Sequence, residues 1–238
     1  MRPAFYALRP GGWRDYVSLL HAPYTAWHLA NVVVAGCLVP EVPWGRLALT
    51  VLAFALALGI GAHALDELNG RPLRTQIPST VLVTLAIVSV AGACALGIAV
   101  ASRTTCWLLA FVVVGAFLVP AYNLELFGGR FHTNLWLGLA WGAFPVLTTY
   151  VACAETVRVE AFAAAGWAML TVLAQRALST PVRHVRRKVL AVKGHLELID
   201  GTREELSPEL LVAGPETALR LLPAAMVLLA VAMVALRL

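Results

Sequence analysis

Long apolar stretches alternate with short segments rich in charged residues along the whole chain. A membrane-crossing helix needs about 20 mostly apolar residues, and seven stretches approach this length. We therefore predict an all-α, polytopic transmembrane bundle of seven spans, forming a single membrane domain over residues 1–238. The predicted spans are residues 18–39, 46–64, 79–101, 105–122, 134–153, 159–177 and 218–236. Residues 178–217, between spans 6 and 7, form the longest segment outside them.

The overall composition agrees with this pattern. Of the 238 residues 60% are hydrophobic and 13% are charged, and the mean hydropathy is +0.80. Soluble chains carry roughly a quarter charged residues, so an ordinary soluble domain is excluded. The net charge of +5 is better explained by membrane topology than by binding to nucleic acid.

The distribution of Lys and Arg predicts how the bundle is oriented. With the N-terminus in the cytosol, fourteen of these residues fall in inner segments and four in outer ones. Positive residues concentrate on the cytosolic side of membrane proteins, so we expect a multi-pass protein of the cell membrane whose N-terminus and active face are cytosolic. The four on the outer side are Arg46, Arg103, Arg158 and Arg237.

Span 1 carries the clearest polar stripe inside a predicted helix. His21, Tyr24, His28 and Asn31 are separated by three, four and three residues, a spacing that puts them on one helical face. Polar groups inside a membrane are costly and need a partner, a cavity or a function. This stripe is therefore predicted to line a binding cavity.

The end of span 2 is the densest cluster of ionisable residues. His63, Asp66 and Glu67 share a helical face. Two adjacent carboxylates can hold a hard cation such as Mg²⁺, whose other ligands are then phosphate oxygens. Arg71 and Arg74 follow directly and would contact the same phosphates. The alternative is a solvated helix end in which Asp66 pairs with Arg71.

A second group of polar residues follows span 4. Glu125, Arg130 and His132 lie in a Gly-containing connection, and Asn134 opens a stripe in span 5 that includes Trp141. Under the predicted topology these residues meet the ends of spans 1 and 2 on the cytosolic side. A polar loop followed by a helix-packing stripe is the alternative interpretation.

The segment 178–217 is expected to begin with a basic amphipathic helix at the lipid headgroups. Ser207 and Pro208 then mark the start of the last helix. The apolar stripe of the amphipathic helix consists of Val182, Val185, Val189, Val192 and Leu196.

Two cofactor-based classes fit the sequence poorly. A retinal protein needs a lysine inside its last helix, whereas Lys188 and Lys193 both precede it. A haem between helices needs histidines on facing helices, and the histidine pair of span 1 shares one helix. The cysteines show no zinc-binding spacing. Cys106 and Cys153 both fall near the outer surface, where they either pair or pack as small apolar residues.

Several sequence segments together resemble the UbiA-type membrane prenyltransferase family. They are His-Ala-Pro-Tyr-Thr at 21–25, the acidic end of span 2 leading into Arg-Pro-Leu at 71–73, Tyr-Asn-Leu at 122–124, and the Asn134…Trp141…Pro145 pattern. This resemblance implies a helical intramembrane cavity that opens to the cytosol. It also implies an isoprenoid diphosphate bound through Mg²⁺ at aspartate-rich motifs, with the prenyl tail between the helices.

The chain departs from the family at both metal motifs. Of the first motif it keeps Asp66, with Glu67 as a near substitute, and residues 176–183 contain no carboxylate where the second would lie. Arginines can supply part of the charge that metals neutralise on a diphosphate leaving group. The arginines placed to do so are Arg71, Arg74, Arg130, Arg176 and Arg183.

The sequence thus leads to a specific expectation: a membrane enzyme that transfers an isoprenoid from its diphosphate to a lipophilic acceptor, or cyclises it. The alternative is a non-catalytic transporter or lipid-binding protein on the same scaffold. The expected partners are the isoprenoid diphosphate, a lipophilic acceptor in the case of prenyl transfer, and membrane lipids, with no nucleic acid. The expected catalytic residues are His63, Glu125 and His132, and the expected Mg²⁺ ligands are Asp66 and Glu67. The expected substrate-binding residues are His21, Tyr24, His28, Asn31, Arg71, Arg74, Arg130, Asn134 and Trp141.

Overall fold

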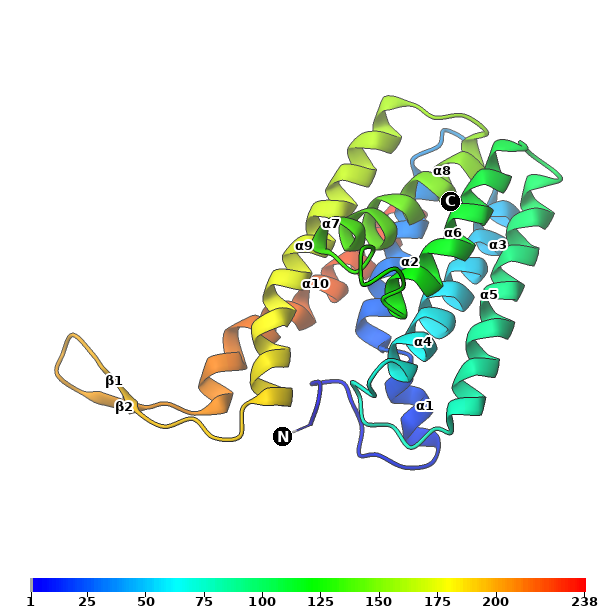
Figure 1. The fold of residues 1–238 in the computed structure, drawn as a ribbon. Helices are drawn as coiled ribbons and strands as arrows, with labels where there is room; N and C mark the ends of the chain where they lie inside the picture. The colour runs from blue at the N-terminus through cyan, green and yellow to red at the C-terminus, as the bar shows by residue number, and fades with distance from the viewer. Residues whose placement is uncertain (1) are drawn as a thin grey trace.

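The computed structural model describes residues 2–238 as a bundle of helices with one small hairpin outside it (Figure 1). Two π-helical segments, η1 and η2, interrupt longer helices. The elements in chain order are α1 (Trp13–Leu19), α2 (Ala22–Cys37), α3 (Trp44–Phe54), η1 (Ala55–Ala62), α4 (His63–Leu68), α5 (Ser79–Ala101), α6 (Trp107–Asn123), α7 (Asn134–Leu137), η2 (Gly138–Ala143), α8 (Phe144–Ala154), α9 (Val159–Lys188), β1 (His195–Glu197), β2 (Arg203–Glu205) and α10 (Pro208–Arg237).

Five helical stretches are long and apolar enough to cross a membrane, which confirms a membrane-type helical bundle. They are Trp44–Leu68, Ser79–Ala101, Asn134–Ala154, Val159–Lys188 and Pro208–Arg237. The other two predicted spans correspond to shorter helices, since α6 has 17 residues and α2 has 16. The count of seven spans and the cytosolic orientation therefore stay predictions.

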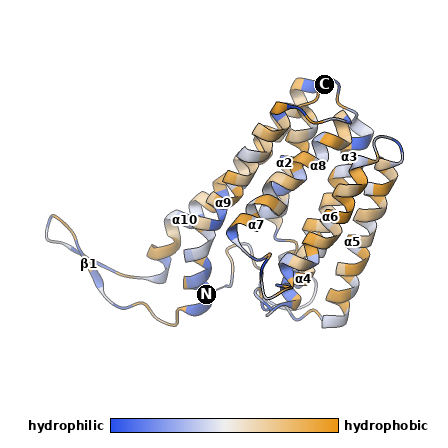
Figure 2. Ribbon diagram, turned by 45° about the horizontal axis from the view of Figure 1, so that its top comes forward, coloured by the Kyte–Doolittle hydropathy of each residue, from blue (hydrophilic) through white to orange (hydrophobic). Residues whose placement is uncertain are grey.

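Large apolar side chains cover the outside of the bundle. Ile87 and Val88 on α5, Val113 on α6 and Leu228 on α10 are all more than 60% exposed. In Figure 2 apolar residues follow these helices along most of their length, whereas hydrophilic residues gather at helix ends and in the hairpin. A surface of this kind matches a hydrocarbon surrounding, in which the helices satisfy their own backbone groups.

The two π-helical segments lie in the helices that face the centre of the bundle. η1 leads directly into α4, and η2 connects α7 to α8. π-Helical turns are uncommon and often occur at functional sites. The backbone of η2 also packs closely on α9, because a Cβ at Gly142 would lie 2.7 Å from the Cα of Met169. Only glycine permits this approach.

The central core brings together side chains from four parts of the chain. Val32 of α2, Leu58 of η1, Tyr122 of α6 and Trp141 of η2 belong to one buried cluster. α10 lies along α2 and α9 on the other side of the bundle, where Trp27 and Met226 share a second cluster. The chain thus closes around α2, which is in contact with both groups.

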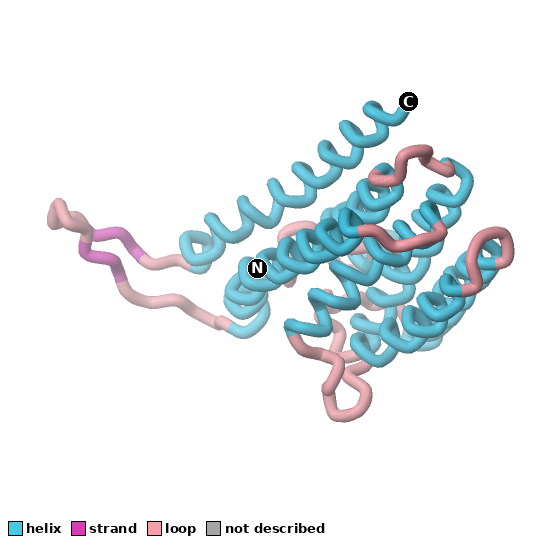
Figure 3. Tube along the Cα trace, turned by 90° about the horizontal axis from the view of Figure 1, so that it is seen from above, coloured by secondary structure: helices cyan, strands magenta, loops and turns pink. Residues whose placement is uncertain are grey.

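The expected amphipathic helix at residues 182–196 is not present. Residues 182–188 instead extend α9, which continues through Pro181 as one helix of 30 residues. Val182 is buried against Val212 and Leu219 of α10, so the start of the apolar stripe packs inside the protein, whereas Leu196 at its end is exposed on the hairpin. The chain then leaves the bundle as an antiparallel hairpin in which His195 pairs with Glu205 (Figures 1 and 3).

Two smaller expectations are settled by the structure. Ser207 does begin the last helix, because its hydroxyl accepts a hydrogen bond from the backbone N–H of Leu210 at 3.1 Å. Cys106 and Cys153 are both free thiols, the first exposed and the second buried. They therefore do not pair with each other.

Candidate functional site

A cavity of about 700 Å³ lies at one end of the bundle. It is bounded by the N-terminal segment, the start of α2, α4, the end of α6, η2 and the second half of α9. We call this end of the molecule the cavity end, and the opposite end, where α8 meets α9, the closed end. A cavity of this size falls within the range of small-molecule sites.

Eight residues expected at the site from the sequence line this one cavity. They come from α2, α4, η2 and the connection after α6, which are far apart in the chain. They are His21, Tyr24, His28, His63, Asp66, Glu125, His132 and Trp141. The structure thus brings the stripe of span 1 and the clusters after spans 2 and 4 to a common space.

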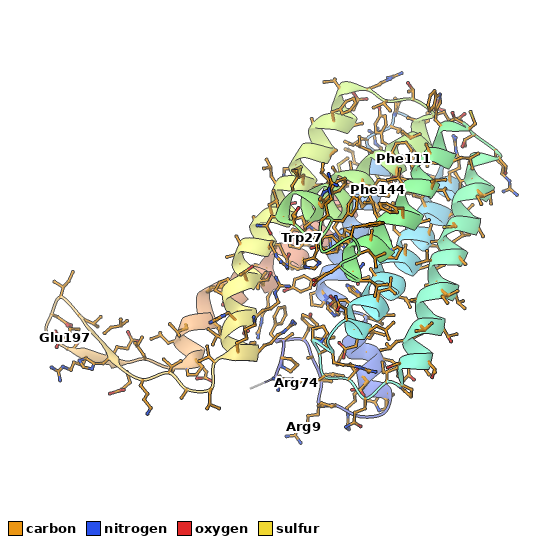
Figure 4. All side chains as sticks on the ribbon, in the orientation of Figure 1. Arg9, Trp27, Arg74, Phe111, Phe144 and Glu197 are labelled. Carbon is orange, nitrogen blue, oxygen red and sulfur yellow. The ribbon has the colours of Figure 1, made fainter. Side chains whose placement is uncertain are left out.

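The other six expected residues do not line the cavity. Arg71 turns into its own loop, where it donates to the carbonyl of Ile77 at 2.5 Å and to the hydroxyl of Ser79 at 2.9 Å. Arg74 lies among the loops at the lower end of Figure 4 and is exposed. Arg130 and Asn134 are exposed too, whereas Asn31 and Glu67 are buried.

Glu67 and its neighbour Asp66 have different surroundings. The two carboxylate oxygens of Glu67, which is 1% exposed, accept hydrogen bonds from the N–H groups of Leu73 and Thr75 at 3.0 and 2.8 Å and from the Thr75 hydroxyl at 2.9 Å. Glu67 thus fixes the loop after α4. Asp66 faces the cavity. Of the two expected Mg²⁺ ligands, only Asp66 is therefore directed at the cavity.

This donor set is smaller than the one expected for a magnesium centre. Hard cations such as Mg²⁺ bind through several oxygen ligands, and Asp66 is the one carboxylate of the expected pair that reaches the cavity. Within residues 2–238, no group of three or more His, Cys, Asp or Glu side chains is arranged to hold a metal. The role of Mg²⁺ stays a prediction, and no step below depends on it.

Histidines and aromatic rings form one wall of the cavity. The rings of His21 and His63 stack with centroids 4.0 Å apart. The Tyr6 hydroxyl lies 3.1 Å from His21 Nδ1. Burial raises the pKa of the Tyr6 phenol, and the nearby Tyr24 adds to this, so Tyr6 stays protonated and donates this bond. His63 Nδ1 in turn lies 3.2 Å from the Gly59 carbonyl, which leaves its Nε2 as the acceptor nitrogen.

His132 is held by the same kind of contact on the opposite side. Its Nδ1 donates to the Tyr122 carbonyl at 3.0 Å, and its ring stacks on that of Tyr122 with a centroid distance of 4.5 Å. Tyr122 packs in turn on Trp141 at 4.4 Å. Two histidines with an assigned acceptor nitrogen thus lie on separate walls, which suits proton transfer to or from a bound molecule.

The second half of α9 contributes a cationic wall. Arg176, Arg183 and Arg187 are spaced by seven and four residues, lie on one helical face and line the cavity. Arg187 donates to the Pro3 carbonyl at 3.3 Å. Among the described residues, Arg176 and Arg183 donate no side-chain hydrogen bond and form no ion pair. Their charge is therefore available to a ligand.

Two interpretations of these arginines follow from the sequence. Arg176 and Arg183 are expected to neutralise a diphosphate leaving group, whereas a separate amphipathic helix at the membrane surface puts Arg183 and Arg187 at the lipid headgroups. The spacing from Arg176 to Arg187 was a usable signal, because it continues the face of span 6 through Pro181 without a change of register.

The N-terminal segment closes part of the cavity mouth. Residues 3–6 line the cavity, and the ring of Phe5 packs edge-to-face on Tyr24. Arg186 forms a bidentate ion pair with Glu216 of α10 and also donates to the Arg2 carbonyl at 3.1 Å. The segment is thus attached to the C-terminal end of α9, beside the cationic wall.

Several buried polar atoms of α2 have no hydrogen-bond partner among the described residues. They are Nε1 of Trp27, Nδ1 of His28 and both side-chain amide atoms of Asn31. Trp27 and His28 line the cavity, and Figure 4 shows Trp27 in the interior of the bundle. Nearly all buried polar groups in proteins are hydrogen-bonded, so the unpaired atoms of Trp27 and His28 point to a polar group supplied by a ligand, whereas Asn31 lies outside the cavity lining.

Comparison with known proteins finds no matching family model, no matching curated protein and no matching solved structure.

Proposed function

We propose that this chain is a UbiA-like membrane enzyme that acts on an isoprenoid diphosphate in the cavity, by prenyl transfer to a lipophilic acceptor or by cyclisation. One observation carries the proposal. The arginines of α9, two of them unpaired, face a cavity whose other walls carry aromatic rings and histidines, together with the carboxylates of Asp66 and Glu125, inside an apolar bundle. A ligand that matches both the arginines and the aromatic rings has an anionic head group and an apolar body. That body is either neutral or electron-deficient.

The cationic wall suits the leaving group of such a reaction. Guanidinium groups bind phosphate oxygens through planar, charge-assisted pairs. When the bond between C1 of the prenyl chain and the diphosphate oxygen breaks, its electron pair leaves with the diphosphate. Arg176 and Arg183 stabilise the charge that develops there.

The aromatic wall suits the other product of that cleavage. An allylic cation remains on the chain, and faces of aromatic rings attract cations. Tyr24, Tyr122 and Trp141 supply such faces at the cavity. A carbon of the acceptor, or a double bond of the same chain, then donates an electron pair to the cation.

The remaining step is loss of a proton from the new product. His63 and His132 each present a free Nε2, because their Nδ1 atoms donate to carbonyl groups. Either nitrogen can accept that proton. Glu125 lies at the cavity, and its Oε1 is 4.0 Å from His132 Nδ1, so it stabilises the charged imidazole that results.

The proposal is tested with the full chain in lipid nanodiscs and a panel of allylic diphosphates. Equilibrium binding and release of pyrophosphate are measured with and without lipophilic acceptors. We expect saturable binding that Arg183→Met weakens by about 10- to 100-fold, the range for loss of charge-assisted hydrogen bonds. Arg158→Met, at the exposed start of the same helix, serves as the matched control and should bind normally.

The results separate the rival classes. Absence of saturable binding for every chain length, or unchanged binding by Arg183→Met, would overturn the proposal. Saturable, Arg183-dependent binding without pyrophosphate release in the presence of acceptors assigns the chain to the alternative class, a membrane protein that binds or moves lipid diphosphates without chemistry.

A further inference from the structure

A second, smaller cavity of about 90 Å³ lies between α3, η1, α5, α6 and α8. Its walls are almost entirely apolar and include the rings of Phe54, Phe111 and Phe144. Figure 4 shows Phe111 and Phe144 together in the part of the bundle away from the N-terminus, and their ring centroids are 5.9 Å apart. This cavity is a different chemical environment from the one at the α9 arginines.

The few polar groups at this cavity are already used. The Thr50 hydroxyl donates to the Arg46 carbonyl at 2.8 Å, and the Thr148 hydroxyl donates to the Phe144 carbonyl at 2.7 Å. Both bonds stay within their own helices. The space therefore offers no free hydroxyl donor to a ligand, and it fits a hydrocarbon group rather than a polar one.

Trp141 is the one residue that lines both cavities in the described part of the chain. It is 8% exposed and packs on Tyr122. Its backbone is fixed, because the adjacent Gly142 is in direct contact with the backbone of Ala168 and Met169. The indole therefore stands as a partition between a polar chamber and an apolar chamber.

The volume limits what the apolar chamber can hold. A dry cavity of about 150 Å³ in another protein accommodates one benzene molecule. A chamber of about 90 Å³ thus has room for roughly one branched unit of about five carbons, after small side-chain adjustments. Each buried methylene adds about fourfold to affinity, so filling this space has a measurable effect.

We propose that Trp141 determines chain-length specificity. The apolar chamber takes the terminal isoprene unit of a chain whose diphosphate is bound at the α9 arginines. The indole sets how many isoprene units fit between the arginines and this chamber. This inference rests on the proposed function for the identity of the head group. It adds the second chamber, Trp141 as the residue between the two chambers, and the resulting limit on the length of the prenyl chain.

The test compares binding of prenyl diphosphates of one to four isoprene units by nanodisc-embedded variants. Ala93→Leu and Ala116→Leu fill the apolar chamber from α5 and α6. We expect each to weaken the longest chain accepted by the wild type by at least tenfold and to leave the one-unit diphosphate unchanged. Ala95→Leu, at an exposed position of α5 outside the chamber, is the matched control and should leave the length profile unchanged.

Trp141→Ala tests the partition itself. It should shift the preferred length upward by one unit, because loss of the indole widens the passage by which the chain reaches the apolar chamber. Since loss of a buried indole also lowers stability, the filling variants above carry the test independently of whether this variant folds.

Two outcomes overturn the inference. The first is that Ala93→Leu and Ala116→Leu fail to change the length profile. This happens if they have no effect on binding, or if they weaken the binding of every chain equally, including the shortest. The second is mass-spectrometric detection of a co-purifying phospholipid that these variants displace, which would assign the chamber to a bilayer acyl chain. If no diphosphate binds the wild type at all, the proposed function fails. If binding depends on Arg183 but not on the filling variants, only this inference fails.

Discussion

The two ends of the bundle use their polar groups in opposite ways. At the closed end they are partnered: Arg46 donates to Glu155 at 2.5 Å, and the Tyr150 hydroxyl donates to Glu160 at 2.5 Å. Arg237 also donates to the Cys37 carbonyl at 2.9 Å. At the cavity end, arginines of α9 and polar atoms of α2 have no partner among the described residues. The unpaired groups that line the cavity, Arg176, Arg183, Trp27 and His28, are therefore available to a ligand.

The backbone shows the same contrast. Six non-glycine residues of the described chain have a left-handed φ, and five of them lie at the cavity end. Glu155 is the one at the closed end. This conformation costs free energy for residues with a Cβ and is concentrated at functional sites. The five at the cavity end are His21, Arg71, Arg74, Glu125 and Phe127.

The largest expected effect is a loss of stability on substitution of Glu67. Glu67 holds the loop after α4, whereas its neighbour Asp66 faces the cavity. Glu67→Leu leaves the donors of Leu73 and Thr75 buried without an acceptor. We expect the free energy of unfolding to fall by about 3–5 kcal/mol, the cost of breaking a buried network. The measurement is equilibrium unfolding in mixed detergent micelles.

Asp66→Asn is the control for this prediction. Its carboxylate faces the cavity, so the free energy of unfolding should change by less than about 1 kcal/mol. Equal losses for the two variants would contradict the different roles assigned to these neighbours.

Asn31 is expected to lower the stability of the folded chain. Its side chain is 1% exposed and both amide atoms lack a partner in the described structure. Asn31→Leu replaces an unsatisfied polar group with an apolar one of similar size, so stability should rise by about 1–3 kcal/mol. Because Asn31 does not line the cavity, binding of the diphosphate ligand should stay unchanged. Thermal unfolding and ligand binding by the same preparation check both parts.

Thr149 at the closed end supplies the matched comparison. It is fully buried, but its hydroxyl donates to the Pro145 carbonyl at 2.7 Å. Thr149→Val therefore removes a hydrogen bond instead of an unsatisfied group, and it should not stabilise the protein. A gain for Thr149→Val as large as that for Asn31→Leu would show that unpaired polarity is not special to the cavity end.

Periodicity along the sequence was enough to predict most of the helices and half of the site. Predicted span 79–101 coincides with α5, and the stripe of span 1 places His21, Tyr24 and His28 on the cavity. Such predictions succeed because i, i+3 and i+4 spacing is a local property of a helix. It fixes which residues share a face before any partner is known.

What the sequence could not supply was the path of the chain after a helix ends. Arg71 and Glu67 look like site residues by spacing, but the loop after α4 turns back and uses both to satisfy its own backbone. Pro181 looks like a helix end, but α9 continues through it and carries Arg183 into the cavity. Both outcomes depend on tertiary contacts, which periodicity does not encode.

The smallest expected effect belongs to the closed end. Arg46 and Glu155 form a short ion pair, but their side chains are 31% and 46% exposed. Exposed pairs contribute about 0–1 kcal/mol, because solvent screens the attraction and two flexible side chains must be ordered. In a double-mutant cycle with Arg46→Met and Glu155→Gln, we expect a coupling free energy below about 1 kcal/mol and unchanged ligand binding. A larger coupling, or any loss of binding, would mean that the closed end also acts on the cavity and that the two ends are not independent.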